Sequence, residues 1–149
     1  MKVLPFDPFV ESADIKINFF TGDECNVRIP VVPMEEVLKE SDFISFHVPG
    51  GEVLGKDEFG ILKKGVGIIN TSRGGVVNEE ALLEALESGI VSFAALDVFT
   101  GEPNPNPALL NHPKISVTPH IGAATGEAQT RIGIEMAEKI IHFFETHEE

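Results

Sequence analysis

Short apolar runs rich in β-branched and aromatic residues alternate along the chain with segments of helical spacing. Runs such as Phe-Ile-Ser-Phe-His-Val are apolar on both faces, which is typical of a parallel sheet covered by helices on both sides. The pattern therefore predicts an α/β fold built on a doubly wound parallel sheet. The expected strands are residues 2–6, 27–32, 43–48, 66–70, 93–99 and 115–118.

Helical spacing predicts helices at residues 34–39, 57–63 and 79–88. The third has the clearest signals, because Asn78 can cap it and Gly89 can end it. A long C-terminal helix is expected over residues 124–146, with Thr125 as a possible N-cap and one apolar stripe. That stripe fits packing on its own sheet or on a neighbouring domain. Residues 11–26 and 100–113 are expected to be surface loops.

Charge and composition narrow the class of protein. The 149 residues carry 11 Lys and Arg against 24 Asp and Glu, for a net charge of -13. With no basic run, a nucleic-acid or anionic-membrane partner is not expected, and no apolar stretch approaches the roughly 20 residues of a membrane span. Cys25 is the single cysteine, which excludes an internal disulfide and a cysteine cluster for zinc. We expect no metal site and a cytoplasmic protein.

Candidate catalytic and binding residues lie at three predicted strand ends. In a sheet of this kind, the loops that follow the strands bind ligands. Arg73 follows the strand at 66–70, and its planar guanidinium suits a carboxylate. The two glycines after it would let a ligand approach the backbone closely. Asp97 lies towards the end of the next strand and Glu102 in the loop after it, and His120 stands between the last strand and the long helix. Taken singly, these residues could equally be a surface ion pair, turn carboxylates and a structural histidine. The near match to a phosphate loop at 65–70 lacks the third glycine and enters a strand, so it predicts no phosphate site.

Three segments together resemble the D-isomer-specific 2-hydroxyacid dehydrogenases: NTSRGGVVNEEALLEAL at 70–86, AALDVFTGEP at 94–103 and TPHIGAATGEAQTRIG at 118–133. Within that family, PHIGAATGEAQTRIGIEMAEKII and the connection at 47–56 look most like the 3-phosphoglycerate dehydrogenases. The resemblance implies a partial Rossmann-like sheet. It also implies NAD-dependent oxidation of a D-2-hydroxy acid, with 3-phosphoglycerate giving 3-phosphohydroxypyruvate in serine biosynthesis.

The resemblance also implies roles for three catalytic residues. Arg73 would hold the substrate carboxylate and polarise the 2-oxo group. His120 would donate a proton during reduction and remove it during oxidation. Glu102 would bond to the far ring nitrogen of His120, orient the ring and favour its charged form.

For the cofactor, Asp7 matches the acid that bonds the adenosine ribose hydroxyls, and its charge favours NAD over NADP. Asp7 before Pro8 is equally a turn former. Further NAD contacts are expected at His47, Val48, Thr71, Ser72, Arg73, Asp97, His120, Ile121, Gly122 and Ala123.

In the family, a substrate-domain part, a first strand, a glycine-rich turn and a helix precede the segment that starts at Lys2. We therefore expect residues 1–149 to form one incomplete NAD-binding domain that lacks the first strand and helix. The sheet must then leave an edge open, pair in a new way or borrow from a partner. Self-association, or association with an N-terminal half, is expected, and no activity of the chain alone. The alternatives are a non-catalytic remnant and a binding or scaffold module derived from such an enzyme.

Overall fold

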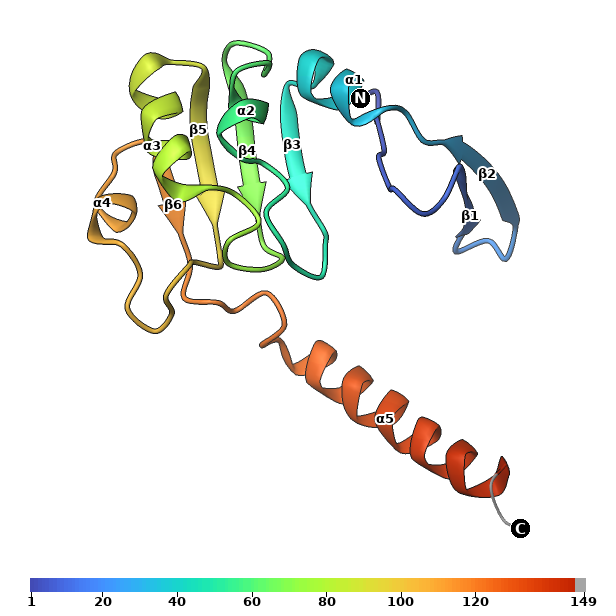
Figure 1. Ribbon diagram of the computed structural model, residues 1–149. Coiled ribbons are helices and arrows are strands. Elements are labelled where there is room, and N and C mark those ends of the chain that lie inside the picture. Colours follow the sequence, from blue (N-terminus) through green and yellow to red (C-terminus); the bar gives the residue numbers. More distant parts are fainter. Residues whose placement is uncertain (147–149) are drawn as a thin grey trace.

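The computed structural model describes residues 1–146 and contains a parallel sheet, a separate hairpin and a long terminal helix (Figure 1). The elements, in chain order, are β1 (Ser12–Asn18), β2 (Glu24–Pro30), α1 (Met34–Glu40), β3 (Phe43–Phe46), α2 (Lys56–Phe59), β4 (Val66–Asn70), α3 (Glu79–Ser88), β5 (Val91–Leu96), α4 (Pro107–Leu110), β6 (Ile115–Val117) and α5 (Gly126–Thr146).

The main sheet has the order β3-β4-β5-β6, with every neighbouring pair parallel. The α/β class and four of the predicted strands are therefore confirmed, although β3 and β6 end earlier than expected and β5 both begins and ends earlier. The predicted helix at 57–63 is the single turn α2, because the chain leaves the helical path at Gly60 and Ile61. Since all four strands run the same way, their carboxyl ends meet at one edge of the sheet (Figure 1).

Helix α3 anchors the core on one face of this sheet. The Asn78 side chain accepts a hydrogen bond from the Ala81 amide, and Gly89 ends the helix at φ 73°. These are the start and stop signals read from the sequence, and the predicted bounds are confirmed. Leu82 and Leu86 are fully buried in the cluster that contains Ile68 of β4. Burying a leucine in this way stabilises a fold by about 1.5–3 kcal/mol.

The opposite face of the sheet is less covered by the described residues. Phe43 is 63% exposed and Phe93 is 37% exposed, and their rings lie 5.9 Å apart. Gly67 lies between them, and a Cβ there would come within 2.6 Å of the Phe93 ring. The expectation that helices cover both faces is therefore wrong for residues 1–146 of this structure.

The N-terminal quarter differs most from the expected arrangement. Residues 2–6 form no strand, and Pro5 is held by a hydrogen bond from the Val32 amide to its carbonyl. Residues 11–26, expected as a loop, contain β1, which pairs antiparallel with β2. The predicted strand at 27–32 is thus the second half of a hairpin and has no partner in the main sheet.

Local pattern explains this hairpin. Ala13, Ile15 and Ile17 alternate with polar residues and face Ile29, Val27 and Cys25 across the pair. Gly22, at φ 89°, allows the tight connection between the strands. A hairpin of this kind closes a short loop, whereas a parallel pairing in the main sheet would require a distant neighbour.

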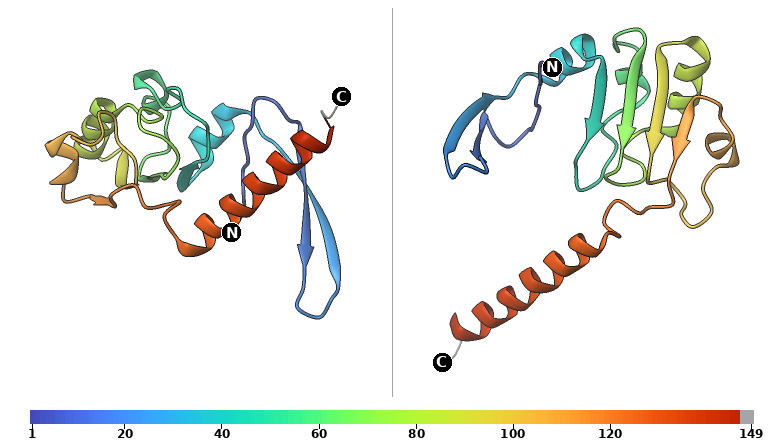
Figure 2. Two further views of the ribbon diagram at one scale, coloured as in Figure 1. Left: turned by 90° about the horizontal axis from the view of Figure 1, so that it is seen from below. Right: turned by 180° about the vertical axis from the view of Figure 1, so that it is seen from behind.

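Helix α5 extends away from the sheet in every view (Figures 1 and 2). Thr125 Oγ1 accepts a hydrogen bond from the Ala128 amide, so the predicted N-cap is confirmed. No residue of α5 is buried. Among the helices that the structure describes, none is long and apolar enough to span a membrane.

Candidate functional site

The three candidate segments leave the carboxyl edge of the main sheet next to one another. Arg73 follows β4, Asp97 and Glu102 follow β5, and His120 follows β6. Since β4, β5 and β6 are neighbours in the sheet, the topology brings these side chains to one edge.

A buried asparagine shapes the turn that carries Arg73. Asn70 is 2% exposed, and its Oδ1 accepts hydrogen bonds from the amide and the hydroxyl of Ser72. Its Nδ2 donates to the Arg73 carbonyl at 3.0 Å. The guanidinium Nη1 donates to the Ser72 carbonyl at 2.6 Å, and Arg73 itself is exposed. The backbone of the turn is therefore fixed, while the charged group faces solvent.

Glu102 and His120 form a carboxylate–imidazole pair. His120 Nδ1 lies 2.8 Å from Glu102 Oε2, and Glu102 Oε1 accepts the Phe99 amide at 2.8 Å. These two interactions, that with His120 first, lower the pKa of Glu102 below its usual value. The carboxylate therefore stays ionised and can orient the ring, which leaves His120 Nε2 as the nitrogen available to a substrate.

His120 adopts a backbone conformation that side-chain-bearing residues rarely take, with φ 54°. Asp97 stabilises the turn on both sides of it. Oδ1 of Asp97 accepts the Thr118 hydroxyl at 2.5 Å and the Ile121 amide at 2.9 Å, and Oδ2 accepts the Gly122 amide at 2.8 Å. The strained position of His120 is thus held by one buried carboxylate.

Asp97 is 3% exposed. Burial raises the pKa of the Asp97 carboxyl, but the hydrogen bonds from Thr118, Ile121 and Gly122 outweigh it, and the pKa lies below the ordinary value. Because a carboxylate offers about four acceptor positions, one position on Oδ2 remains beside Gly122. A Cβ at Gly122 would lie 3.0 Å from that oxygen and 3.9 Å from the Thr71 carbonyl. Thr71, Asp97 and Gly122 therefore converge.

The remaining predicted cofactor residues lie elsewhere or point differently. His47 Nε2 lies 2.9 Å from Ser45 Oγ, and Val48 packs against the core cluster. Asp7 lies in the N-terminal segment, outside both sheets, and its Oδ1 accepts the Phe9 amide at 2.8 Å. The strand that was expected to end at Asp7 is absent there, and Asp7 makes the turn that was the alternative interpretation. Ile121 and Ala123 are exposed in the turn after β6.

Sequence reasoning missed the roles that four residues have at this edge: Asn70, Gly74, Glu79 and Thr118. The signal for Asn70 was a polar residue at the end of an otherwise apolar strand. The other three act through contacts between loops that are far apart in the sequence, so local pattern carried no signal for them.

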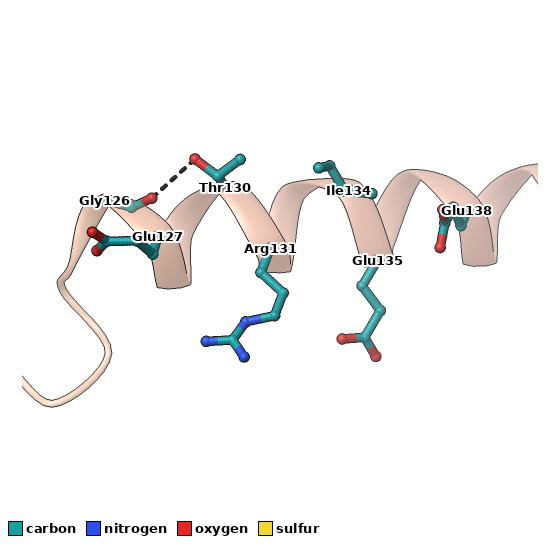
Figure 3. Close-up of a pocket in the computed structure, with 7 residues that line it drawn as sticks. All are labelled: Gly126, Glu127, Thr130, Arg131, Ile134, Glu135 and Glu138. Atoms are coloured by element: carbon teal, nitrogen blue, oxygen red, sulfur yellow. Dashed lines mark hydrogen bonds between the residues drawn. The ribbon is translucent and has the colours of Figure 1, made fainter. Parts of the chain in front are cut away.

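A hollow of about 730 Å³ lies along α5, away from the sheet edge (Figure 3). All its lining residues belong to that one helix, from Gly126 to Glu138. A ligand site surrounds its ligand with several elements. This hollow is therefore the open side of a projecting helix, and the candidate site is the sheet edge.

The parallel sheet and its carboxyl edge define a Rossmann-like dinucleotide-binding fold, and comparison with known proteins gives the family. Residues 1–122 match the model of the D-isomer specific 2-hydroxyacid dehydrogenase, NAD binding domain. The chain belongs to this family.

Two curated relatives illustrate the similarity. The chain is 46% identical over 120 residues to D-3-phosphoglycerate dehydrogenase 3, chloroplastic, of Arabidopsis thaliana, covering 77% of this chain and 20% of the relative. It is 41% identical over 147 residues to hydroxypyruvate reductase of Thermotoga maritima, covering 94% and 44%. The chain thus spans less than half the length of either relative.

A solved structure supports the fold. NAD-dependent formate dehydrogenase from Staphylococcus aureus, in complex with NAD, matches with a TM-score of 0.67 at 32% identity, covering 77% of this chain and 36% of that one.

The residues of the edge fit the nicotinamide end of NAD. The free acceptor position on Asp97 Oδ2 suits a carboxamide N–H, and Gly122 leaves space that a Cβ would fill. The pyrophosphate is usually held by a glycine-rich turn at a helix N-terminus. The 149 residues contain no Gly-x-Gly-x-x-Gly turn, so the fit covers one end of the cofactor.

Replacing Asp97 by Asn is expected to lower the free energy of unfolding by about 1–3 kcal/mol, because the amide N–H₂ then opposes one of the three donors. The folded-state pKa lies below the ordinary 3.8, so the carboxylate stabilises the fold above that pH. This contribution is lost as the pH falls through the folded-state value. Urea unfolding at about pH 6 and about pH 3 should show the deficit shrinking at the lower pH. Asp14→Asn, on the exposed hairpin, is the control, and a deficit that does not change with pH contradicts the prediction.

Proposed function

We propose that this chain carries the proton-transfer and NAD-binding part of a D-2-hydroxyacid dehydrogenase that oxidises 3-phosphoglycerate to 3-phosphohydroxypyruvate. The observation that carries this proposal is the Glu102–His120 pair, held at 2.8 Å beside the turn that bears Arg73. A scaffold module needs no ionised carboxylate on a histidine in a left-handed conformation, so this geometry favours an enzyme over the non-catalytic alternatives. The similarity to a phosphoglycerate dehydrogenase supports the substrate, and serine biosynthesis is the pathway that would use it.

In the proposed reaction, Arg73 binds the substrate carboxylate through its exposed guanidinium and places C2 at the sheet edge. His120 Nε2 removes the hydroxyl proton as the C2–O bond becomes a carbonyl, and Glu102 stabilises the positive charge that develops on the ring. When bound, NAD accepts the hydride that leaves C2. In the reverse direction the protonated His120 returns the proton to the alkoxide oxygen.

The residues proposed to contact NAD lie in the turns at the sheet edge: Thr71, Ser72, Arg73, Asp97, His120, Ile121, Gly122 and Ala123. The backbone of His47 and Val48 is proposed to contribute further contacts. Asp7 stays a proposed ribose contact. A cytoplasmic location and a single NAD-binding unit over residues 1–149 also stay predictions.

The test is NADH formation from 3-phosphoglycerate, D-glycerate and D-lactate, with NAD and NADP compared for each. The chain is assayed alone and fused behind the N-terminal half of the Thermotoga maritima reductase. We expect turnover in the fusion, preference for 3-phosphoglycerate and NAD, and a KM for the acid raised at least about tenfold in Arg73→Lys, because lysine lacks the bidentate fork. Arg131→Lys on α5 is the control. Preference for another acid would reassign the substrate. Preference for NADP would remove Asp7 from the proposed cofactor contacts.

We further expect the chain by itself to associate, either with a second copy or with an N-terminal half, and to lack dehydrogenase activity. Seven large apolar residues of α5 are each at least half exposed: Ile132, Ile134, Met136, Ile140, Ile141, Phe143 and Phe144. Exposed apolar surface on this scale marks an interaction site. Light scattering at low and high concentration measures the association. A monomer at both concentrations that turns over substrate contradicts the prediction.

A further inference from the structure

The loop that carries Glu102 contacts the segment that carries Arg73 at the peptide group between Phe99 and Thr100. The Thr100 amide of this group donates to Glu79 Oε1 at 2.6 Å. Glu79 is the first residue of α3, six positions after Arg73. The carbonyl of the same peptide faces Gly74, where a Cβ would come within 2.1 Å of the Phe99 oxygen.

The neighbouring amide of this loop is bonded to the catalytic pair. The Phe99 N–H donates to Glu102 Oε1, and Glu102 Oε2 meets His120 Nδ1. Two carboxylates therefore hold two successive amides, one from α3 and one from within the loop. Phe99 is buried, with 7% of its surface exposed, so the peptide group is fixed in the core on one side.

From these contacts we propose that Glu79 is a positioning residue, which sets the place of the Glu102–His120 pair relative to Arg73 through the Thr100 amide. This inference rests on the proposed function. Glu79 has no contact of its own with Glu102 or His120 among the described interactions, so it acts through the 99–102 loop.

A simpler role for Glu79 is the favourable interaction of any acidic residue with the first turn of a helix, which is typically worth about 0.3–1 kcal/mol. Glu80 lies in the same turn and is exposed, and no hydrogen bond is described for its side chain. The two explanations differ in what they require. Positioning requires an acceptor that reaches Thr100, whereas the helix end requires only a negative charge.

Two substitutions separate reach from charge. Glu79→Gln keeps the length and an acceptor oxygen but loses the charge, and Glu79→Asp keeps the charge but is one methylene shorter. Glu80→Asp and Glu80→Gln are the matched controls. If Glu79 positions the loop, Glu79→Asp disturbs the Glu102–His120 pair more than Glu79→Gln does, and Glu79→Gln keeps part of the parent behaviour.

The first measurement is the NMR signal of the proton between His120 Nδ1 and Glu102, recorded on the 149-residue chain. We expect a downfield ring resonance in the parent chain, its loss or broadening in Glu79→Asp, and its retention in Glu79→Gln and in both Glu80 variants. The backbone spectrum confirms that each variant is folded. Retention of the signal in Glu79→Asp, or an equal loss in Glu80→Asp, overturns the inference.

The second measurement is kinetic and uses the fusion with the N-terminal half of the Thermotoga maritima reductase. Glu79→Asp should lower kcat about 10-fold to 100-fold, as expected for a displacement on the order of 1 Å, while the KM for NAD stays the same. A fall in kcat for Glu79→Gln larger than that for Glu79→Asp overturns the inference. The two measurements also separate the inference from the proposed function. A change in the ring signal without catalysis by His120 would reject the function and leave the positioning role standing.

Discussion

Replacing His120 by Asn is expected to lower kcat by about 10² to 10⁴-fold, because this substitution removes the general base and acid while keeping a side chain of similar size. In the structure Nδ1 is bound to Glu102, so Nε2 is the nitrogen that we propose exchanges the substrate proton. Steady-state NADH formation in the fusion measures the effect. The KM for the acid should change little, since Arg73 is proposed to hold it.

His142→Asn is the matched control for this prediction. His142 lies on the exposed surface of α5, far along the chain from the sheet edge, and its replacement should leave kcat unchanged. Glu102→Gln should keep measurable turnover at a lower kcat, because the neutral amide no longer stabilises the positive charge that develops on the His120 ring during proton transfer. Turnover of His120→Asn equal to the parent would assign the proton transfer to another group.

The second large effect is expected for Gly74→Ala. A Cβ at this position would lie 2.1 Å from the Phe99 carbonyl oxygen and 2.6 Å from its carbon, and both are backbone atoms that cannot rotate away. We expect a loss of at least about 1–3 kcal/mol in the free energy of unfolding. Displacement of the 99–102 loop should also weaken the His120 ring resonance. Urea unfolding and the same NMR signal measure the two consequences.

Gly133→Ala provides the comparison for Gly74. Gly133 lies inside α5, where an added Cβ would meet nothing within 4 Å, so alanine should stabilise the helix by about 0.5–1 kcal/mol. Substitution by alanine is thus expected to lower the free energy of unfolding at Gly74 and to raise it at Gly133. Equal stability of Gly74→Ala and the parent would show that the 99–102 loop does not pack against Gly74.

The contact of Gly74 also changes the interpretation of the glycines beside Arg73. From the sequence, these glycines are expected to let a ligand approach the backbone. The contact with Phe99 instead makes Gly74 a packing requirement between two loops of the site. Gly75, at φ 78°, satisfies a turn conformation. Neither observation bears on ligand approach, which stays a prediction.

The elements that local pattern determines are those whose signals lie within a few residues. Helix α3 has its cap at Asn78, its stop at Gly89 and its leucines on one face, and the structure reproduces the predicted bounds. The runs at 43–48 and 66–70 are apolar on both faces, which indicated a parallel sheet, and β3 to β6 are indeed parallel. The family followed from the three long segments around Arg73, Glu102 and His120.

The pairing of the N-terminal strands was decided by tertiary structure. The run at 27–32 fits a parallel or an antiparallel strand equally well, because strand pattern does not name its partner. In the fold it pairs with β1, since the alternating residues Ala13, Ile15 and Ile17 are near in sequence and close a short loop.

The contacts of the sheet edge were likewise beyond local pattern. Glu79 with Thr100, Thr118 with Asp97 and Gly74 with Phe99 each join residues about 20 or more positions apart. Such contacts exist only once the parallel strands have brought their carboxyl ends together. For that reason the sequence could name the candidate catalytic residues, while the fold decided what holds them in place.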